Sequence, residues 1–600
     1  MAGSAESSAE RPHVQQTLSS PGRFYHQGSL PILNAKRKTG TSQTLRPHDQ
    51  PHVHTGKSLQ RTPPIQKEPS SPFLTTFEKL SENSNSEPPD ANPRNPGDSI
   101  HEGVWVVDGP HRTVWRSEGL INAGTILVAN GATFIKTRDA VENNGVILVT
   151  NGASFVDRDI INAVDDDAVF IVRDASSATA NRRFRAGEGA GYTAYVEVSD
   201  NSTLTARNMF IGNFGTGIMV ATNSDISVSA GLTVGRQNGS LGIIELNEAN
   251  LSVGGNLRIA NGGDAAGVIV LQQQSRIDAN SLTIAQAGSG ILSVVDSVVA
   301  VTGNVKVAAG GSAIGTVVLE NSTMQMAGRL DIAQQNGSIG SVTARSGSTL
   351  AATGNVRVGV RNSSTATLEI DSGSTARSGG NVLVNNNGTL TLNQGTLDAV
   401  GDLSVEGSMF TTDSTIRIGD DFSLASGSIL RGGVNDIYEI SGSFNNDIVA
   451  VADFDLSDVT IRFMAPGTPS DSVDVRGVDL GPDAFGYVDN YAIHGLSLAS
   501  GRSLQLVDSG SSGGALYVQT LVLDDGVIQL ADISGDALNI YYNPALPENA
   551  YLGGLTYPLG NGTSNLLPIG IPEPGTLFLM LLGFTCLYQR SSRKQEESTH

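Results

Sequence analysis

Apolar and polar residues alternate in short runs along the middle of the chain, and the pattern repeats about ten times between Ala194 and Ser428. Most repeats open with an apolar or alternating run, pass a polar corner, and continue with a second alternating run. A glycine then leads into a third run, as in Gly255-Asn-Leu-Arg-Ile259 and Gly354-Asn-Val-Arg-Val358. The turns are 20 to 26 residues long and start at Ala194, Ile218, Ile243, Val268, Ile291, Thr316, Ser341, Thr367, Thr389 and Met409.

Three period-2 runs in each turn predict three short β-strands that bury their inner side chains only by stacking on the neighbouring turns. Leucine-rich repeats share the period, but their Leu-x-x-Leu-x-Leu signature is missing, and helical repeats need apolar residues at i, i+3 and i+4. Corners rich in Gly, Asn, Asp and Ser are typical of β-solenoids. The predicted fold is therefore all-β, a single-stranded β-solenoid (β-helix) with its repeat array over 194–430.

The segment 101–193 predicts an N-terminal cap and the first turns of the solenoid. Gly124 to Phe134 recurs 21 residues later as Gly145 to Phe155, and each copy carries an Asn-Gly pair that favours a tight turn. Phe134 and Phe155 are then expected to stack at equivalent positions. Trp105 and Trp115 precede this repeat, and we interpret them as packing of the cap in preference to a platform for carbohydrate.

The pattern loosens between Asn162 and Gly191, where the run Asp165-Asp-Asp167 and the basic string Arg182-Arg-Phe-Arg185 occur. An outward loop is the expectation for this stretch, and a small binding patch is the alternative.

The flanking regions differ in composition from the array. Residues 431–545 have a non-repeating β pattern, which predicts a C-terminal β cap that continues or closes the stack, and 546–571 predicts a spacer. Residues 1–100 hold 13 of the 23 prolines without a sustained apolar period, so this region is expected to be disordered. No basic start followed by an apolar run of a secretory signal is recognised there.

The charge excludes one class of partner. The net charge is −21; residues 1–100 carry 11 basic and 9 acidic residues, and the remainder carries 27 and 50. Nucleic acid is not an expected partner, because a phosphate backbone needs a basic surface. Cys586 is the only cysteine, so no intramolecular disulfide and no multi-cysteine zinc site is expected.

The C-terminal end combines three short features. Pro572, Glu573 and Pro574 precede an apolar run from Gly575 to Tyr588, whose 14 residues would make a helix of about 21 Å, short of the ~20 residues of an ordinary membrane span. Basic residues directly after such a run hold that end in the cytoplasm. We therefore expect one short C-terminal transmembrane helix formed by Leu577, Phe578, Leu579, Met580, Leu581, Leu582, Phe584, Leu587 and Tyr588, with Arg590, Arg593 and Lys594 as the basic stop.

Residues 572–600, with Pro-Glu-Pro, a short apolar helix and a basic finish, resemble the PEP-CTERM sorting signal of exported bacterial proteins. The resemblance implies recognition of Pro572, Glu573 and Pro574 by an exosortase, a membrane-embedded transpeptidase-like enzyme, and delivery to the cell surface or extracellular matrix. The basic finish is sparser than the arginine cluster of the family. The array also resembles the passenger-associated repeats of autotransporters, in segments such as Gly388 to Leu397.

Candidate chemistry is sparse along the array. Glycosidases place paired carboxylates on one face, whereas the acids here fall at turn corners, where Asp and Asn make local backbone hydrogen bonds. We interpret them as turn residues in preference to a metal ladder, and expect no metal and no cofactor. The string Gly510-Ser-Ser-Gly-Gly514 lies in a loop before a strand, unlike a nucleophile elbow. The corner acids are Glu248, Asp296, Glu320, Asp371 and Asp413.

The expected function is that of an exported structural or adhesive protein of the cell surface, outer membrane or matrix, and not of an enzyme. Its expected partners are the exosortase-type enzyme, the membrane through the C-terminal helix, and exopolysaccharide or neighbouring cells. A carbohydrate-active or carbohydrate-binding β-helix is the alternative. Ice binding is a weaker third hypothesis, since no Thr-x-Thr is held in register over consecutive turns.

Overall fold

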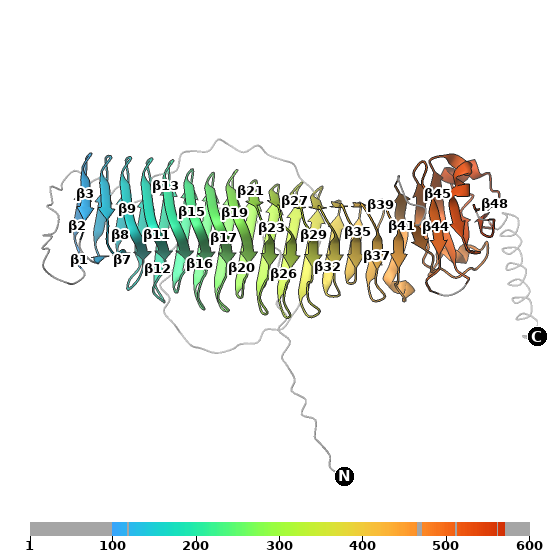
Figure 1. Cartoon of the computed structure of the whole chain (residues 1–600), viewed down its shortest axis with the longest axis horizontal. Helices are drawn as coiled ribbons and strands as arrows, with labels where there is room; N and C mark the ends of the chain where they lie inside the picture. Colours follow the sequence, from blue (N-terminus) through green and yellow to red (C-terminus); the bar gives the residue numbers. More distant parts are fainter. Residues whose placement is uncertain (1–98, 117–118, 465–470, 511–512, 561, 571–600) are drawn as a thin grey trace, which may run out of the picture. The chain divides into compact units, whose positions relative to one another are not determined.

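The chain forms an all-β parallel β-solenoid, which confirms the predicted β-solenoid, and its turns number about 19, more than the repeat pattern indicates. The computed structural model describes residues 99–116, 119–464, 471–510, 513–560 and 562–570. Successive turns lie side by side along one axis, and most strands pair in parallel with their equivalents in the preceding and following turns (Figure 1). Each turn contributes three strand segments, so the strands form three parallel faces, which we number 1 to 3 in chain order.

Face 1 is a regular ladder of short parallel strands. Its fifteen strands before the C-terminal region are β2 (Val104–Val107), β5 (Thr125–Val128), β8 (Val146–Val149), β10 (Ala168–Val172), β12 (Thr193–Ser199), β14 (Thr216–Thr222), β16 (Leu241–Asn247), β18 (Ala266–Gln272), β20 (Ser289–Val295), β23 (Ile314–Glu320), β26 (Ile339–Arg345), β29 (Thr365–Asp371), β32 (Gly388–Asn393), β35 (Ser408–Thr412) and β38 (Ile429–Arg431).

Faces 2 and 3 meet at a bend that six long strands cross without a break. These strands are β9 (Ser154–Asn162), β11 (Ser177–Ala186), β13 (Thr203–Ile211), β15 (Asp225–Val234), β17 (Asn250–Ile259) and β19 (Arg276–Ile284). Their pairing register shifts at the bend in several cases, as between Ala180 and Arg183 of β11.

In the other turns, separate strands form the two faces. Face 2 contains β3 (Arg112–Trp115), β6 (Thr133–Lys136), β21 (Val298–Val301), β24 (Thr323–Met326), β27 (Thr349–Ala352), β30 (Thr375–Ser378), β33 (Thr396–Ala399), β36 (Thr415–Ile418) and β39 (Asp436–Ile440). Face 3 contains β1 (Ser99–His101), β4 (Leu120–Asn122), β7 (Ala140–Asn143), β22 (Val305–Val307), β25 (Leu330–Ile332), β28 (Val356–Val358), β31 (Val382–Val384), β34 (Leu403–Val405), β37 (Phe422–Leu424), β40 (Phe444–Asn446), β42 (Ser472–Asp474), β44 (Leu504–Val507) and β46 (Ile533–Gly535).

The predicted turn starts agree with the observed register. Parallel pairing places eight of them, from Ile218 to Thr389, in one column of face 1. The predictions Ala194 and Met409 are each one residue off this column, which contains Tyr195 and Ser408 instead. Since side chains alternate between the two sides of a strand, this column faces outward and its neighbours face the core.

The main core is one continuous column of mostly aliphatic side chains that runs from the first turn to the last. At the corner where the chain passes from face 3 to face 1, the backbone segments of this corner and of the preceding turn approach so closely that glycine is required. A Cβ at Gly242 would lie 2.2 Å from the carbonyl oxygen of Ile211, and one at Gly315 would lie 2.6 Å from the amide nitrogen of Ala308. The core therefore depends on small residues at this corner as much as on large ones elsewhere.

Aromatic side chains fill the core of the first turns. Trp105 and Trp115 are buried with ring centroids 5.3 Å apart, which confirms that they pack in the core. Phe134 and Phe155 stack at 4.9 Å as predicted, and Asn130 and Asn151 have the positive φ expected of the Asn-Gly turns.

The expectation of an outward loop between Asn162 and Gly191 was wrong. The segment forms β10 and β11, a complete turn with Phe170 and Phe184 buried in the core. β10 is apolar throughout, but the polar run Asn181-Arg-Arg183 interrupts the alternation of β11 between its inward alanines and Phe184. Pairing with both neighbouring turns stabilises the turn.

The parallel ladder continues through most of the region predicted as a cap, and the segment expected as a spacer also carries strands. β41 (Phe454–Phe463), β43 (Ile493–Leu498) and β45 (Ala515–Leu523) pair in succession, followed by β47 (Asn539–Tyr542) and β49 (Asn565–Pro568). β48 (Tyr557–Pro558) pairs antiparallel with β49. Four 3-10 helices lie between the strands of this region: η1 (Val451–Asp453), η2 (Ala484–Tyr487), η3 (Gly526–Asp532) and η4 (Pro547–Leu552).

Two predictions fall on residues that the structure does not describe. The expected disordered region lies outside the described residues up to residue 98, while 99 and 100 belong to β1. The expected transmembrane helix over 577–588 also lies outside them. Within 99–570, apart from the gaps given above, the helices are too short and too polar to cross a membrane.

Candidate functional site

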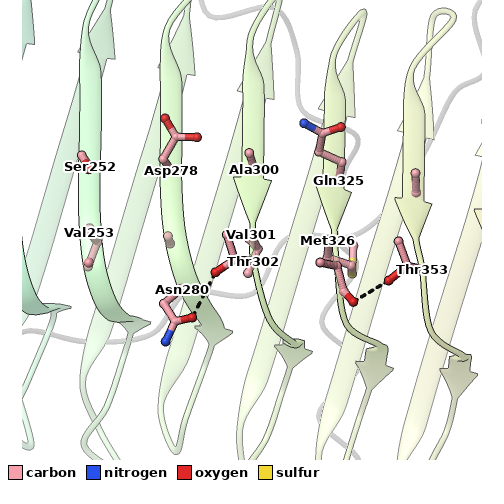
Figure 2. Close-up of a pocket in the computed structure, with 14 residues that line it drawn as sticks. Ser252, Val253, Asp278, Asn280, Ala300, Val301, Thr302, Gln325, Met326 and Thr353 are labelled. Atoms are coloured by element: carbon pink, nitrogen blue, oxygen red, sulfur yellow. Dashed lines mark hydrogen bonds between the residues drawn. The ribbon is translucent and has the colours of Figure 1, made fainter.

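A groove of about 540 Å³ runs across five turns at the bend between faces 2 and 3 (Figure 2). The floor lies over Val253, Ala279, Val301 and Met326. The side chains of these four residues point into the core and are almost completely buried. The walls carry hydroxyl, amide and carboxylate groups. They come from Ser252, Asp278, Asn280, Thr302, Gln325 and Thr353, together with Gly254, Ala300, Ala327 and Ala351.

Small outward residues make the groove. On one wall, parallel pairing aligns Ser252, Asp278, Ala300, Gln325 and Ala351 in one column, so three of five positions carry a side chain no larger than serine. The next residue of the column is Arg377, whose side chain is 62% exposed and pairs with Asp398 at 3.4 Å. The groove therefore ends at the turn in which this column carries the large, charged side chain of Arg377.

The polar groups of the groove are held by neighbours in the sheet. Arg276 donates two hydrogen bonds to Asp278, at 2.7 and 2.6 Å, so this carboxylate is neutralised by an adjacent cation. The Thr302 hydroxyl donates to Asn280 Oδ1 at 3.0 Å, and the Thr353 hydroxyl donates to the carbonyl of Ala327. Such fixed hydroxyl and amide groups suit an uncharged ligand with many hydroxyls better than an ion.

A column of threonines runs beside this groove on face 2. Parallel pairing aligns Thr323, Thr349, Thr375, Thr396 and Thr415 in five consecutive turns. All five are partly exposed, and adjacent strands in such a ladder are about 4.8 Å apart. The outer surface thus repeats one hydroxyl at a constant interval, a regularity that the unequal turn lengths hide in the sequence.

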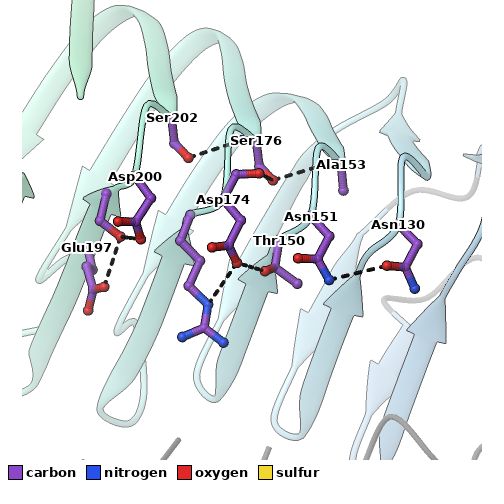
Figure 3. A network of polar contacts seen from close by, with 11 residues as sticks. Asn130, Thr150, Asn151, Ala153, Asp174, Ser176, Glu197, Asp200 and Ser202 are labelled. Atoms are coloured by element: carbon purple, nitrogen blue, oxygen red, sulfur yellow. Dashed lines mark hydrogen bonds and ion pairs between the residues drawn. The ribbon is translucent and has the colours of Figure 1, made fainter. Parts of the chain in front are cut away.

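Polar side chains pair from turn to turn at the corner between faces 1 and 2 (Figure 3). Asn151 donates to Asn130 at 3.2 Å, and the Thr150 hydroxyl donates to Asp174. Next to this exposed row, buried serines accept amide protons of the preceding turn, as Ser176 accepts from Ala153 at 3.2 Å. The row continues along the solenoid with Ser202, Ser275, Ser322, Ser348, Ser374 and Ser414 as acceptors.

The corner acids occupy the turn positions that the sequence predicts. Glu248, Asp296 and Asp413 have φ near +50°, the left-handed conformation of a tight corner. Asp296 and Asp413 accept hydrogen bonds from Asn321 and Asn435 in the next turn, at 2.6 and 2.8 Å. Glu320 pairs with Arg345 at 3.0 Å, and Asp371 closes a backbone turn with Ser374.

A second hollow of about 520 Å³ lies at this corner, lined by Glu248, Gln273, Gln274, Asp296 and Asn321. Because two of these side chains already bond to each other, the hollow is a shallow polar notch within the corner row.

Besides the corner acids and the polar hollow, a cluster of three aspartates lies where face 2 meets face 3. Carboxylate oxygens of Asp402, Asp420 and Asp421 lie within 4.8 Å of one another, a donor set that suits a divalent cation such as Ca²⁺. Two of these carboxylates already accept backbone protons: Asp402 accepts from Asp421 at 3.3 Å, and Asp421 accepts from Ser443 at 2.7 Å. Partial burial and the neighbouring carboxylates raise the pKa of Asp420.

These carboxylates continue a column of asparagines that the Gly-Asn motif of the repeats supplies. Asn355 accepts from the amide of Asn381 at 3.1 Å, and Asn381 accepts from the amide of Asp402 at 3.3 Å. In this column each side chain accepts the amide proton of the equivalent residue in the following turn. We therefore assign Asp402 and Asp421 to turn-to-turn pairing.

Buried charges also occur near the first turns. The carboxylate of Asp157 is fully buried and accepts backbone protons from Val141 and Arg158 at 2.7 and 2.6 Å. Burial raises the pKa of Asp157 to about 7, against the opposing effects of these hydrogen bonds and of nearby Lys136. This group is far along the solenoid from the groove residues 252–353, so it does not supply the groove with an acid or base.

The basic string at 182–185 does not form a free patch. Arg182 and Arg183 both contact the carboxylate of Asp159, at 3.3 and 3.2 Å, and Arg185 pairs with Glu188 at 2.5 Å. Pairing of each guanidinium with an acid of the same or the adjacent turn leaves little net charge at this surface.

The predicted sorting residues Pro572, Glu573 and Pro574, and the basic stop Arg590, Arg593 and Lys594, lie outside the described residues. The groove and the threonine column were not predicted. The feature of the sequence that could have indicated them is the size and type of the outward residues. The outward residues of different turns can be aligned only when the register of the turns is known. Comparison of the chain with protein-family models, curated proteins and solved structures found no match.

Proposed function

We propose that this chain is an exported structural or adhesive protein of the cell surface or extracellular matrix, whose solenoid holds a polysaccharide chain along the groove at residues 252–353. The observation that carries the proposal is the groove itself, whose walls combine small apolar side chains with hydroxyl and amide groups and with the carboxylate of Asp278, which is paired with Arg276. A polymer repeats its chemical groups at a fixed interval, and a surface with the same regularity can contact many of its units at once.

The chemistry of the walls favours a neutral or weakly charged polysaccharide. The outward residues Ala300 and Ala351 offer apolar contact to the C–H faces of sugar rings, while Asn280, Thr302 and Gln325 offer donors and acceptors to hydroxyl groups. A polyanion is disfavoured, since the chain carries a net charge of −21.

Binding to isolated exopolysaccharide tests the groove. Ala300 lies in the middle of the groove wall, so Ala300→Tyr fills the space with a side chain that strands accommodate. We expect the full-length variant to bind at least about tenfold more weakly than the wild type, a loss of about 1.4 kcal/mol, in a glycan array followed by calorimetry.

Ser404→Tyr, at an outward position of β34 away from the groove, is the matched control and is expected to bind like the wild type. Equal binding by both variants would contradict the assignment of the groove. Release of soluble sugar during the same incubation, abolished by a single Asp→Ala substitution, would favour a carbohydrate-active enzyme instead.

We further propose that the tail sorts the protein through an exosortase-type enzyme, with Pro572, Glu573 and Pro574 for recognition and the apolar run 577–588 for transient insertion in the membrane. Support comes from the order of the three features in the sequence. Glu573→Ala should leave the solenoid folded, by circular dichroism, but stop processing. Mass spectrometry of the mature C-terminus reads this directly, and an unchanged mature terminus would contradict the role of Glu573.

A further inference from the structure

A loop of the C-terminal region exposes four large apolar side chains. Residues 477–490, between β42 and β43, form this loop and contain η2. Val478, Leu480, Phe485 and Val488 are 57%, 48%, 73% and 61% exposed. Large apolar residues on an ordinary surface are scattered singly, whereas a cluster of them marks a surface that another group covers. We call residues 477–490 the apolar loop.

Hydrogen bonds and ring contacts hold the apolar loop in a fixed shape. The side chain of Asn490 accepts from the amide of Val478 at 2.7 Å and donates to its carbonyl at 3.0 Å, which joins the two ends of the loop. The Tyr517 hydroxyl, from β45, accepts from the amide of Leu480 at 2.8 Å. Tyr487 packs its ring inward against that of Tyr517, with the centroids 5.9 Å apart. Because these contacts fix the loop, its exposed side chains form a surface that is already in place before anything binds.

The described part of the chain ends against the apolar loop. The amide of Gly570, the last described residue, donates to the carbonyl of Pro482 at 2.8 Å. The neighbouring Ile569 is buried in a small apolar cluster against which Tyr487 of the loop packs. Seven residue steps lead from Gly570 to Leu577, where the apolar run of the tail begins, and they span at most about 25 Å. The apolar run therefore begins within reach of the loop.

We propose that the apolar tail, residues 577–588, docks on the apolar loop of its own chain whenever the tail is outside a membrane. The apolar tail contains no charged residue, and water favours contact between two apolar surfaces. A tethered segment meets its site at an effective concentration of about 1 mM, so an intrinsic dissociation constant of about 0.1 mM keeps it docked about nine-tenths of the time. The proposal concerns the chain before any processing, and it requires neither the sorting enzyme nor the polysaccharide.

Opposite charges favour this occupant over an anionic lipid surface. The apolar loop carries the exposed residues Asp483 and Asp489 and contains no lysine or arginine. Three basic residues follow the apolar tail before any acidic one: Arg590, Arg593 and Lys594. Their pairing with the carboxylates of the loop adds a modest attraction and sets the direction in which the tail lies. The same two carboxylates repel an anionic membrane.

The apolar tail carries a native probe of this contact. Cys586 is the only cysteine of the chain and lies within residues 577–588. A thiol reacts with a maleimide only while it is accessible, so docking should slow the reaction of Cys586 in proportion to the fraction of time that the tail is docked. Because the contact forms within one chain, the rate constant should not change with protein concentration.

The reaction rate of Cys586 with a maleimide, measured on the unprocessed full chain in aqueous buffer, tests the docking. Phe485→Ser removes the most exposed ring of the apolar loop, and a contact weakened about tenfold raises the free fraction of the tail, and with it the rate, about fivefold. Ile528→Ser is the matched control, since Ile528 in η3 is 75% exposed and lies outside the loop. The control should react like the wild type.

Cross-linking locates the contact on the surface. A short bismaleimide should join Cys586 to Val488→Cys within one chain, which mass spectrometry reads as a cross-linked monomer. Val434→Cys, at a corner between β38 and β39, is the control, because Val434 is 58% exposed and lies outside the apolar loop. Its cross-linking to Cys586 should be several times weaker.

Three outcomes would overturn the proposal. Equal rates in Phe485→Ser and the wild type, or equal cross-linking of the two cysteine variants, would mean that the tail does not select the apolar loop. A Cys586 rate that falls as the protein concentration rises from about 1 to about 100 µM would mean that a second copy covers the tail. Fast reaction in all variants, together with weaker flotation of Phe485→Ser on phosphatidylcholine vesicles, would mean that lipid covers the loop instead.

Discussion

Three buried asparagines in the first turns should be among the most sensitive positions of the fold. Asn122, Asn143 and Asn162 occupy one column of face 3 and are completely buried. Asn122 donates to Asn143 at 2.8 Å, and Asn143 donates to Asn162 at 3.0 Å. The second amide proton of Asn143 goes to the carbonyl of Val169 at 3.0 Å, so the side chain joins its own turn to both neighbours.

Replacing Asn143 with Ala removes the middle of this column. The substitution leaves one amide proton of Asn122 and the acceptor of Asn162 without their partners, in a region that water does not reach. Each buried group that loses its partner costs about 1–3 kcal/mol, and the small cavity adds to that cost. We therefore expect Asn143→Ala to destabilise these turns by about 3 kcal/mol.

The assay has to report on individual turns, since a solenoid need not unfold in a single step. Hydrogen exchange of peptides from 120–172 should accelerate by about a hundredfold in Asn143→Ala, while peptides near residue 400 stay protected. The control is Asn250→Ala, which removes an exposed asparagine bonded to Asp225 at 2.9 Å and should cost at most about 0.5 kcal/mol. Equal exchange in the two variants would refute the reasoning that the column stabilises the stack.

Two other buried polar groups give predictions of opposite sign. Because the pKa of Asp157 is raised to about 7, the folded protein binds a proton that the unfolded chain releases near pH 4, and this group's contribution to stability falls as pH rises from 4 to 7. Asp157→Asn should therefore match the stability of the wild type near pH 4 and be more stable than it at pH 8, by up to about 4 kcal/mol and with a higher melting temperature. A difference that does not change with pH would contradict the pKa shift. Ser348→Ala should instead destabilise by about 1–2 kcal/mol at any pH in urea unfolding, because the hydroxyl accepts from Ser322 and donates to Arg345; an unchanged midpoint would count against the serine row.

The sequence predicted the unit of the fold because that unit is local. The alternation around Ile218, Ile243 and Val268 fixes which side chains enter the core, and the Asn-Gly pairs fix where the chain turns. The turn with β10 and β11 was missed, because the polar run Asn181-Arg-Arg183 interrupts the alternation of β11, and its pairing with the turns on either side is not visible in the sequence.

The functional surfaces could not be predicted in the same way. Serine suits an exposed strand position as well as a corner, so nothing in the sequence marks Ser348 and its equivalents as buried. The small wall residues Ser252 and Ala300 likewise become a groove only when the turns between them, of unequal length, are brought into register. Long-range register, and not local propensity, decides which residues share a surface.

The same translation from turn to turn explains both the stability of the stack and its candidate surfaces. Since each residue lies above its equivalent, a favourable contact such as Asn122 with Asn143 is repeated in the next turn, and a chemical property on the outside becomes a column. A single substitution therefore interrupts a series of contacts. A change of residue type along a column ends the surface that the column forms. The groove wall ends in this way between Ala351 and Arg377. A ligand that needs a long uniform surface is thus confined to a defined set of turns, and a substitution at the middle of that set should weaken its binding more than the same substitution beyond its boundary.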